Sequence, residues 1–321
     1  MAFRHPLQRL LAAAMVMTLP LLLSQCAKKP KPPVQGLSLE QQDKLQSTQD
    51  AWMQQKPRIP ERLPDDRLEA LGDLALKNRS FDSSLMHYLQ ILKDQPERYD
   101  LHYKVGVIFL MSGNFEAAQK ELALVLVHRP EMVQAHEAMG LVHLQEKKYA
   151  QAIQEFQLVL SRDPNRAQTN HLLGVTFLES GRPERAVLAL KAAVSQDPRR
   201  TSSLMSLAQA YLQMKDYPQA VATLKQAQAL DPQNKKVHQL LGMALAAQKQ
   251  YPQALEAFMK SGDEAQAYNN IGVHYFMDGQ YEEAAKCFQR AIELRPTFYE
   301  EAKTNLQRAL EKLQATRKDG T

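Results

Sequence analysis

The chain has 321 residues, a formal net charge of +5, 12 glycines and 7% aromatic residues. Abundant leucine and alanine with so little glycine favour helices over strands. The positive charge is concentrated at the N-terminus: residues 1–62 hold nine Lys/Arg against four Asp/Glu, and the rest of the chain holds 31 of each. A neutral folded part argues against a nucleic-acid-binding protein, which normally carries basic charge on its folded face.

The N-terminus has the pattern of an export signal. Two arginines precede an apolar run at residues 10–23, which is too short to span a bilayer. The run ends in Leu-Leu-Ser-Gln, followed by Cys26. This end resembles a bacterial lipoprotein signal with Cys26 as the lipidation site, although Gln25 stands where a small residue is usual. The resemblance implies a signal peptide at residues 1–25, and Ala27 implies an outer-membrane lipoprotein facing the periplasm. Secretion without a lipid, with cleavage nearby, is the alternative.

Residues 26–62 are polar and rich in lysine and proline, so we expect a flexible tether rather than a folded domain. Within this segment, residues 38–55 are compatible with a short helix. Leu45 and Trp52 would share one face of it, because they are seven residues apart. Trp52 either contacts a partner or folds back onto the first repeat unit.

A 34-residue period runs through the remainder of the chain. Glycine or alanine recurs at 72, 106, 140, 174, 208 and 242, and proline recurs at 96, 130, 164, 198 and 232. A small residue recurs at 84, 118, 152, 186, 220 and 254, and a large apolar residue follows four positions later each time. The pattern resembles the tetratricopeptide family, whose unit is two antiparallel helices. It predicts an all-α superhelical solenoid of about seven helix-turn-helix units at residues 63–298, with a polar capping helix at 299–317.

Two packing expectations follow from the repeat. The glycine slot should lie where the two helices of a unit approach most closely, and the large apolar residues should fill the space between neighbouring units. The sixth unit departs from the period, because Gly272 follows Gly242 by 30 residues. We therefore expect the second helix of this unit to be about one turn shorter than the others.

No motif for catalysis is present: the sequence has no phosphate-binding loop, nucleophile elbow or paired cysteines at metal spacing. His102, His136 and His238 share one repeat position, the fourth, and filling that slot explains them better than metal binding does. Cys287 lies on an apolar helix face and is interpreted as a small core residue. We therefore expect a protein that is not an enzyme and that uses no metal, cofactor or small-molecule substrate.

In the tetratricopeptide family the first helix of each unit lines a concave groove through positions 2, 5, 9, 12 and 13. The resemblance implies a protein-binding groove made by Tyr103, Val107, Met111, Leu141, His171, Val175, Met205, Gln209, Met243, Asn269, Val273 and Met277. Tyr103, Met205 and Asn269 occupy the fifth position and are expected to point into the groove. The methionines suggest an adaptable apolar surface, although each of them can equally be a core filler. The residues that clamp a peptide carboxylate in other members are missing.

The end of the chain has a further resemblance. Residues 267–272 (Ala-Tyr-Asn-Asn-Ile-Gly), and Pro296, Tyr299, Ala302, Asn305 and Leu306 after them, resemble the tetratricopeptide lipoprotein of Tad/Flp pilus assembly. This implies a membrane-anchored scaffold that assists assembly of a pilus or secretion apparatus, with a secretin or another pilus component as its protein partner. The alternative is an envelope adaptor for enzymes of cell-wall or exopolysaccharide synthesis.

Overall fold

The structure is a computed structural model that describes residues 40, 43–44, 46–47, 63–295 and 300–319, with side chains to residue 316 in the last segment. The chain divides into two units, Met1–Leu63 and Pro64–Thr321. In the first unit, residues 40, 43–44 and 46–47 are helical and exposed, and Leu63 is exposed outside any helix. The signal peptide, Cys26, Leu45 and Trp52 lie outside the described residues. No helix within the described part of the chain has the length and apolarity that crossing a membrane requires.

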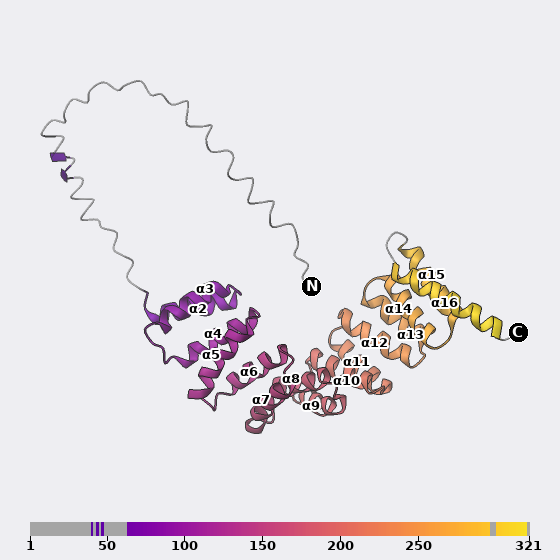
Figure 1. Cartoon of the computed structure of the whole chain (residues 1–321), viewed down its shortest axis with the longest axis horizontal. Helices are drawn as coiled ribbons and strands as arrows, with labels where there is room; N and C mark the ends of the chain where they lie inside the picture. The colour runs from indigo at the N-terminus through magenta and orange to yellow at the C-terminus, as the bar shows by residue number, and fades with distance from the viewer. Residues whose placement is uncertain (1–39, 41–42, 45, 48–62, 296–299, 320–321) are drawn as a thin grey trace, which may run out of the picture. The chain divides into compact units, whose positions relative to one another are not determined.

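The second unit is all-helical throughout its described residues, as predicted, and its helices form consecutive hairpins (Figure 1). The first helices of the seven repeat units are α2 (Asp65–Lys77), α4 (Tyr99–Met111), α6 (Val133–Gln145), α8 (Ala167–Glu179), α10 (Thr201–Gln213), α12 (Lys235–Ala247) and α14 (Glu264–Met277). The second helices are α3 (Phe81–Leu92), α5 (Phe115–His128), α7 (Tyr149–Arg162), α9 (Pro183–Gln196), α11 (Tyr217–Leu230), α13 (Tyr251–Ser261) and α15 (Tyr281–Leu294). The final helix is α16 (Glu300–Asp319).

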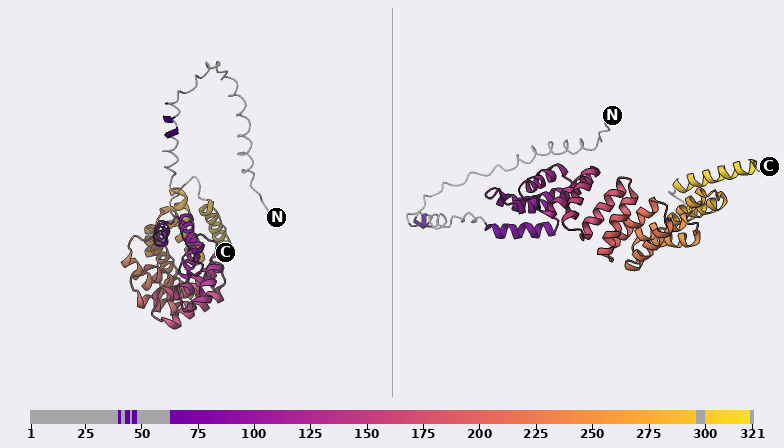
Figure 2. Two further views of the ribbon diagram at one scale, coloured as in Figure 1. Left: turned by 90° about the vertical axis from the view of Figure 1, so that its left-hand side faces the viewer. Right: turned by 90° about the horizontal axis from the view of Figure 1, so that it is seen from below.

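Each helix packs against the next one along the chain, so the hairpins stack in sequence order (Figure 2). From α4 to α16 the first helices also touch one another across successive units. This additional contact places the first helices in the inner layer of the solenoid. Their side chains that do not enter the core therefore share one continuous surface.

The glycine slot is where the two helices of a unit meet. A Cβ added at Gly140 would lie 2.6 Å from Phe156 Cε1, and one added at Gly174 would lie 2.4 Å from Leu190 Cγ. Gly72, Gly106, Gly242 and Gly272 face the large residue of their own unit in the same way. The expectation that the large residues fill the space between units was therefore incomplete, because in six of the seven units the large residue packs over the glycine of its own hairpin. Ala208 takes the place of the glycine in the fifth unit. Because the glycine has no Cβ, there is room beside it for the buried aromatic ring or leucine side chain of the second helix.

The sixth unit has the shortened helix that its spacing predicts. The second helix α13 has 11 residues, whereas α5, α7, α9, α11 and α15 each have 14. Gly262 ends α13, and the side chain of Asp263 caps the next helix by accepting hydrogen bonds from the backbone N–H groups of Ala265 and Gln266. This cap starts the seventh unit about one turn early.

The fourth-position histidines close the turns between units. The Nε2 atoms of His102, His136 and His238 lie 3.0, 2.9 and 2.8 Å from the carbonyl oxygens of the repeat prolines six residues earlier. Asn170 occupies this position in the fourth unit, and its Nδ2 donates to the Pro164 carbonyl at 3.1 Å. A side-chain donor thus reaches this carbonyl in four of the units, whereas the fifth unit has Leu204 at the same position. Within the described residues, no group of three or more potential metal ligands is present.

Cys287 is half-buried on α15, and burial raises the pKa of its thiol to about 11. A thiol with this pKa is protonated and unreactive at neutral pH. Its position on the apolar face of α15 agrees with a packing role.

The capping helix α16 covers the seventh unit with a narrow apolar stripe. Ala302 and Ala309 are fully buried against α14 and α15, and Leu306 is half-buried beside them. The charged residues expected on its outer face are all exposed, namely Glu300, Glu301, Lys303, Arg308, Glu311 and Lys312. A polar outer face with an alanine-rich inner face ends the stack without leaving a large apolar surface.

We expect Gly140→Ala to lower the free energy of unfolding by about 1–3 kcal/mol, because the new methyl group overlaps the Phe156 ring in a packed core. Urea unfolding followed by circular dichroism measures this change. Gln151→Ala, an exposed position on the second helix of the same unit, is the control and should change stability by less than about 0.5 kcal/mol. Equal stability of the two variants would contradict the close approach at the slot.

Candidate protein-binding groove

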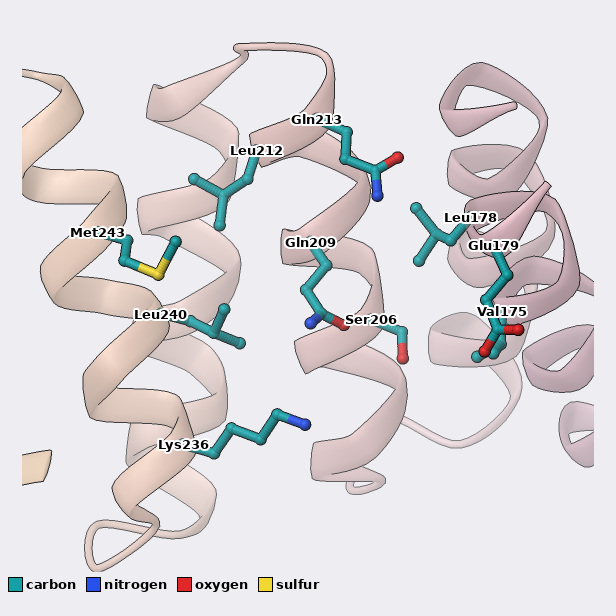
Figure 3. A pocket seen from close by; sticks show the side chains of 10 residues that line it. All are labelled: Val175, Leu178, Glu179, Ser206, Gln209, Leu212, Gln213, Lys236, Leu240 and Met243. Carbon is teal, nitrogen blue, oxygen red and sulfur yellow. The ribbon is translucent and has the colours of Figure 1, made fainter. Parts of the chain in front are cut away.

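A pocket of about 480 Å³ opens on the inner layer, over the first helices of three successive units (Figure 3). One wall is α8, the floor is α10 and the other wall is α12. Counting positions so that the slot glycine is position 8, most of the lining side chains come from positions 2, 9, 12 and 13. The lining residues are Val175, Leu178, Glu179, Ser206, Gln209, Leu212, Gln213, Lys236, Leu240 and Met243.

Three of the residues predicted for the groove meet in this pocket: Val175, Gln209 and Met243, one from each helix. All three occupy position 9, which repeats on the same face of consecutive first helices. Met243 is 40% exposed, so its thioether is available to a ligand rather than filling the core. Position 9 is therefore the position at which successive units combine to form a site.

The other predicted residues lie elsewhere along the solenoid. Met111 is exposed, and Met277 is 77% exposed beside a second, smaller pocket near the end of α12. Most of the rest are half-buried and pack against the core clusters, namely Tyr103, Val107, Leu141, Met205 and Val273. Burial also raises the pKa of the Tyr103 phenol. Val273 also lines a separate pocket of about 140 Å³ with residues of α14, α15 and α16.

Residues at the fifth position form contacts between neighbouring helices of the stack instead of lining the pocket. Asn269 is 1% exposed: its Nδ2 donates to Glu301 Oε1 at 3.2 Å, and its Oδ1 accepts from Asn305 Nδ2 at 3.1 Å. Asn269 was expected to point into the groove, but it does not. Both the nitrogen and the oxygen of its side-chain amide form hydrogen bonds with residues of α16. His171, at the same position of the fourth unit, has its Nδ1 3.1 Å from Ser203 Oγ of the fifth unit.

Several lining residues were missed by the sequence prediction. Lys236 is at position 2, Leu178 and Leu212 are at position 12, and Glu179 and Gln213 are at position 13. The same positional rule that selected Val175 and Met243 would have found all five, had it been applied evenly to every unit. Ser206 and Leu240 are at position 6, for which the rule gave no signal.

The chemistry of the pocket suits a polypeptide segment. Five apolar side chains line it and can take an apolar side chain of a ligand. The amides of Gln209 and Gln213, four residues apart on α10, can both donate and accept hydrogen bonds, as a peptide backbone requires. Lys236 and Glu179 add one charge of each sign at opposite walls, as Figure 3 shows.

Three histidines of the solenoid are less basic than a free histidine because they are buried. Burial lowers the pKa values of His143, His171 and His274, and the Nδ1 of His143 has no hydrogen-bond partner among the described residues. The unfolded chain, with histidine pKa values near 6.5, then binds more protons than the folded chain below that pH. The free energy of unfolding should therefore fall as the pH drops from 7.5 to 5.5.

The triple variant His143→Gln, His171→Gln, His274→Gln should lose much of this pH dependence, because glutamine does not titrate. Urea unfolding at pH 7.5 and 5.5 measures the difference. The carboxylates with lowered pKa values, Glu69 and Asp73 among them, titrate at lower pH and do not contribute in this window. An unchanged pH dependence in the triple variant would show that other groups carry it.

Comparison with known proteins agrees with the repeat geometry. Family models described as tetratricopeptide repeat match residues 69–127, 110–167, 143–210, 177–244, 211–271 and 265–298. No curated protein matches the chain. The chain is similar to the crystal structure of a tetratricopeptide repeat protein from Parabacteroides merdae, with 13% identity, a TM-score of 0.55, and coverage of 77% of this chain and 98% of that one.

A second solved structure has a similar fold. It is the C-terminal part of a repeat-containing protein from Cytophaga hutchinsonii, with 18% identity, a TM-score of 0.59, and coverage of 73% of this chain and 98% of that one. At these identities the likeness concerns the fold alone. Together with the matches that cover residues 69–298, it shows that the chain belongs to the tetratricopeptide repeat family, whose fold is typically a scaffold for protein–protein interaction.

Proposed function

We propose that this protein is a membrane-anchored scaffold that holds a segment of a partner protein in its groove and assists assembly of a Tad/Flp-type pilus or secretion apparatus. The observation that carries the scaffold role is the pocket over α8, α10 and α12, which combines apolar side chains, free amides and opposite charges on the inner layer. A site spread over three repeat units fits an elongated ligand better than a compact small molecule.

The anchor in this proposal is a lipid on Cys26, supported by the leader sequence that precedes it. Acyl chains contribute about 0.8 kcal/mol per buried CH₂ group, and two or more chains hold a protein on a bilayer stably. Residues 27–62 would then connect the lipid to the solenoid. The leader and Ala27 support an outer-membrane location facing the periplasm.

The client in this proposal is a secretin or another pilus subunit. Its support is the sequence of residues 267–272 together with the tail from Pro296 to Leu306, which resembles the pilus-assembly lipoproteins. The competing client is an enzyme of cell-wall or exopolysaccharide synthesis. Both clients are proteins, so one experiment distinguishes them.

The experiment is a crosslinked pull-down of the tagged full-length protein from its native envelope, with mass spectrometry of the captured proteins. Wild type should enrich a secretin or pilus component, and Met243→Asp should reduce the enrichment about tenfold or more, because it places a charge in the pocket. Met259→Asp is the matched control: Met259 is 36% exposed on the second helix of the same unit and should leave capture unchanged.

Cys26→Ala tests the anchor in the same experiment, and it should move the protein out of the membrane fraction and weaken capture. Enrichment of polysaccharide or cell-wall enzymes would overturn the assembly role and support the adaptor role. Equal capture by wild type and Met243→Asp would place the binding surface outside the pocket.

A further inference from the structure

Charged residues on the first helices are paired internally in the early repeat units. Arg98 Nη2 donates to Glu69 Oε2 at 2.7 Å, and Lys104 Nζ donates to Glu69 Oε1 at 2.8 Å. One turn further along α2, Lys104 also reaches Asp73 Oδ1 at 2.7 Å. These contacts cross from the first unit to the second, so the charges serve the stacking of the units.

The same arrangement recurs between the third and fourth units. Arg166 donates to both carboxylate oxygens of Glu137, at 2.8 and 2.7 Å, and the Thr169 hydroxyl donates to the same carboxylate. The Glu137 side chain is only 13% exposed. A bidentate, largely buried pair of this kind holds two units in register and leaves little charge for a ligand.

The pocket differs from both clusters. Glu179 and Lys236 are the charged residues among its lining, and neither side chain has an ion pair or hydrogen bond with another residue described in 63–295 or 300–316. They extend from opposite walls, with Lys236 directed over α10 toward Gln209 (Figure 3). The Gln209 and Gln213 amides between them are likewise without a partner in the described residues. Polar groups left unpaired around an apolar pocket are available to a ligand that carries the complementary groups.

We propose that the occupant of this pocket is an extended segment of a partner protein with three features: an acidic side chain for Lys236, a basic side chain for Glu179, and a large apolar side chain between them for the pocket. This rests on the proposed scaffold function and specifies its ligand. An extended backbone leaves its N–H and C=O groups free for the Gln209 and Gln213 amides, whereas a helix already satisfies most of these groups internally.

The spacing of the ligand's charges follows from the repeat. Neighbouring packed helices lie about 8–10 Å apart, so the walls α8 and α12 are separated by about 16–20 Å across α10. An extended chain advances about 3.3 Å per residue. Because the Lys236 and Glu179 side chains extend from these walls, the charges of the ligand should lie closer together than the walls (Figure 3). Side chains two positions apart share one face of an extended chain, so the acidic and basic residues should be about four positions apart, with the apolar residue midway between them.

The test uses fluorescein-labelled peptides of about ten residues, with leucine at the centre and charged residues about two positions to either side, so that all three side chains share one face of the extended chain. The mixed probe has glutamate on one side and lysine on the other. The comparison probes have glutamate on both sides, lysine on both sides, or glutamine on both sides. Fluorescence polarisation with the full-length protein should give the tightest binding for the mixed probe, about fivefold tighter than the like-charged probes.

Charge reversal then assigns each side chain. Lys236→Glu should shift the preference to the lysine–lysine probe, and Glu179→Lys should shift it to the glutamate–glutamate probe, each by about fivefold. The double variant should again prefer the mixed probe, with the peptide bound in the opposite chain direction. Lys225→Glu, an exposed lysine on the second helix of the fifth unit, is the control and should leave the order of the probes unchanged.

Equal binding of all four probes by wild type, or an unchanged order in Lys236→Glu and Glu179→Lys, would overturn the inference. Thermal melts of the variants check that each remains folded. The proposed function and this inference can be tested apart. If Met243→Asp reduces capture of the native partner but neither charge reversal does, the groove scaffold is supported and the charged, extended ligand is rejected.

Discussion

In six of the seven repeat units, one large side chain packs against one glycine and holds the two helices together, and the stacking of units depends on this contact. Because Gly140 lacks a Cβ, the ring of Phe156 enters between the two helices of its hairpin and is fully buried there. The equivalent pair in the fourth unit is Gly174 with Leu190. A close hairpin presents a flat, apolar side to the next hairpin. Repeating this kind of contact from one unit to the next builds a continuous core out of local interactions.

Polar contacts then fix how one unit sits on the next. In four units a donor at the fourth position reaches the carbonyl of the repeat proline. The fifth-position residue Glu137 is bonded by Arg166 at the start of α8, and Asn269 is bonded to Glu301 of α16. These contacts are directional, so they favour one register of stacking over others that would bury the same apolar area. The apolar core thus provides cohesion, while the polar contacts favour one register of each unit on the next.

That inner layer provides the site. Three first helices, related by the repeat, place their position 9 side chains beside one another. The side chains of Glu179, Gln213 and Lys236 around them have no hydrogen-bond or ion-pair partner among the described residues. Where Glu69 and Glu137 face a basic residue of the following unit, the charge stabilises the scaffold. Glu179 and Lys236 face the open pocket instead. The division between paired and unpaired charges along one surface separates the part of the solenoid that stabilises the stacking of units from the part that we propose binds a ligand.

The sequence by itself determined the helical class, the repeat boundaries, the shortened helix α13 and the polar face of α16. Each of these depends on contacts within one unit or between consecutive units, and such contacts recur with the period of the chain. The sequence also identified the positions that line the inner surface, including Val175, Gln209 and Met243. Only the tertiary structure decided which of these positions combine into a pocket and which are occupied by the protein itself. The side chain of Asn269 is hydrogen-bonded to α16, whereas the Lys236 ammonium has no partner among the described residues. The difference arises because each side chain depends on which residue the neighbouring unit places within hydrogen-bonding distance.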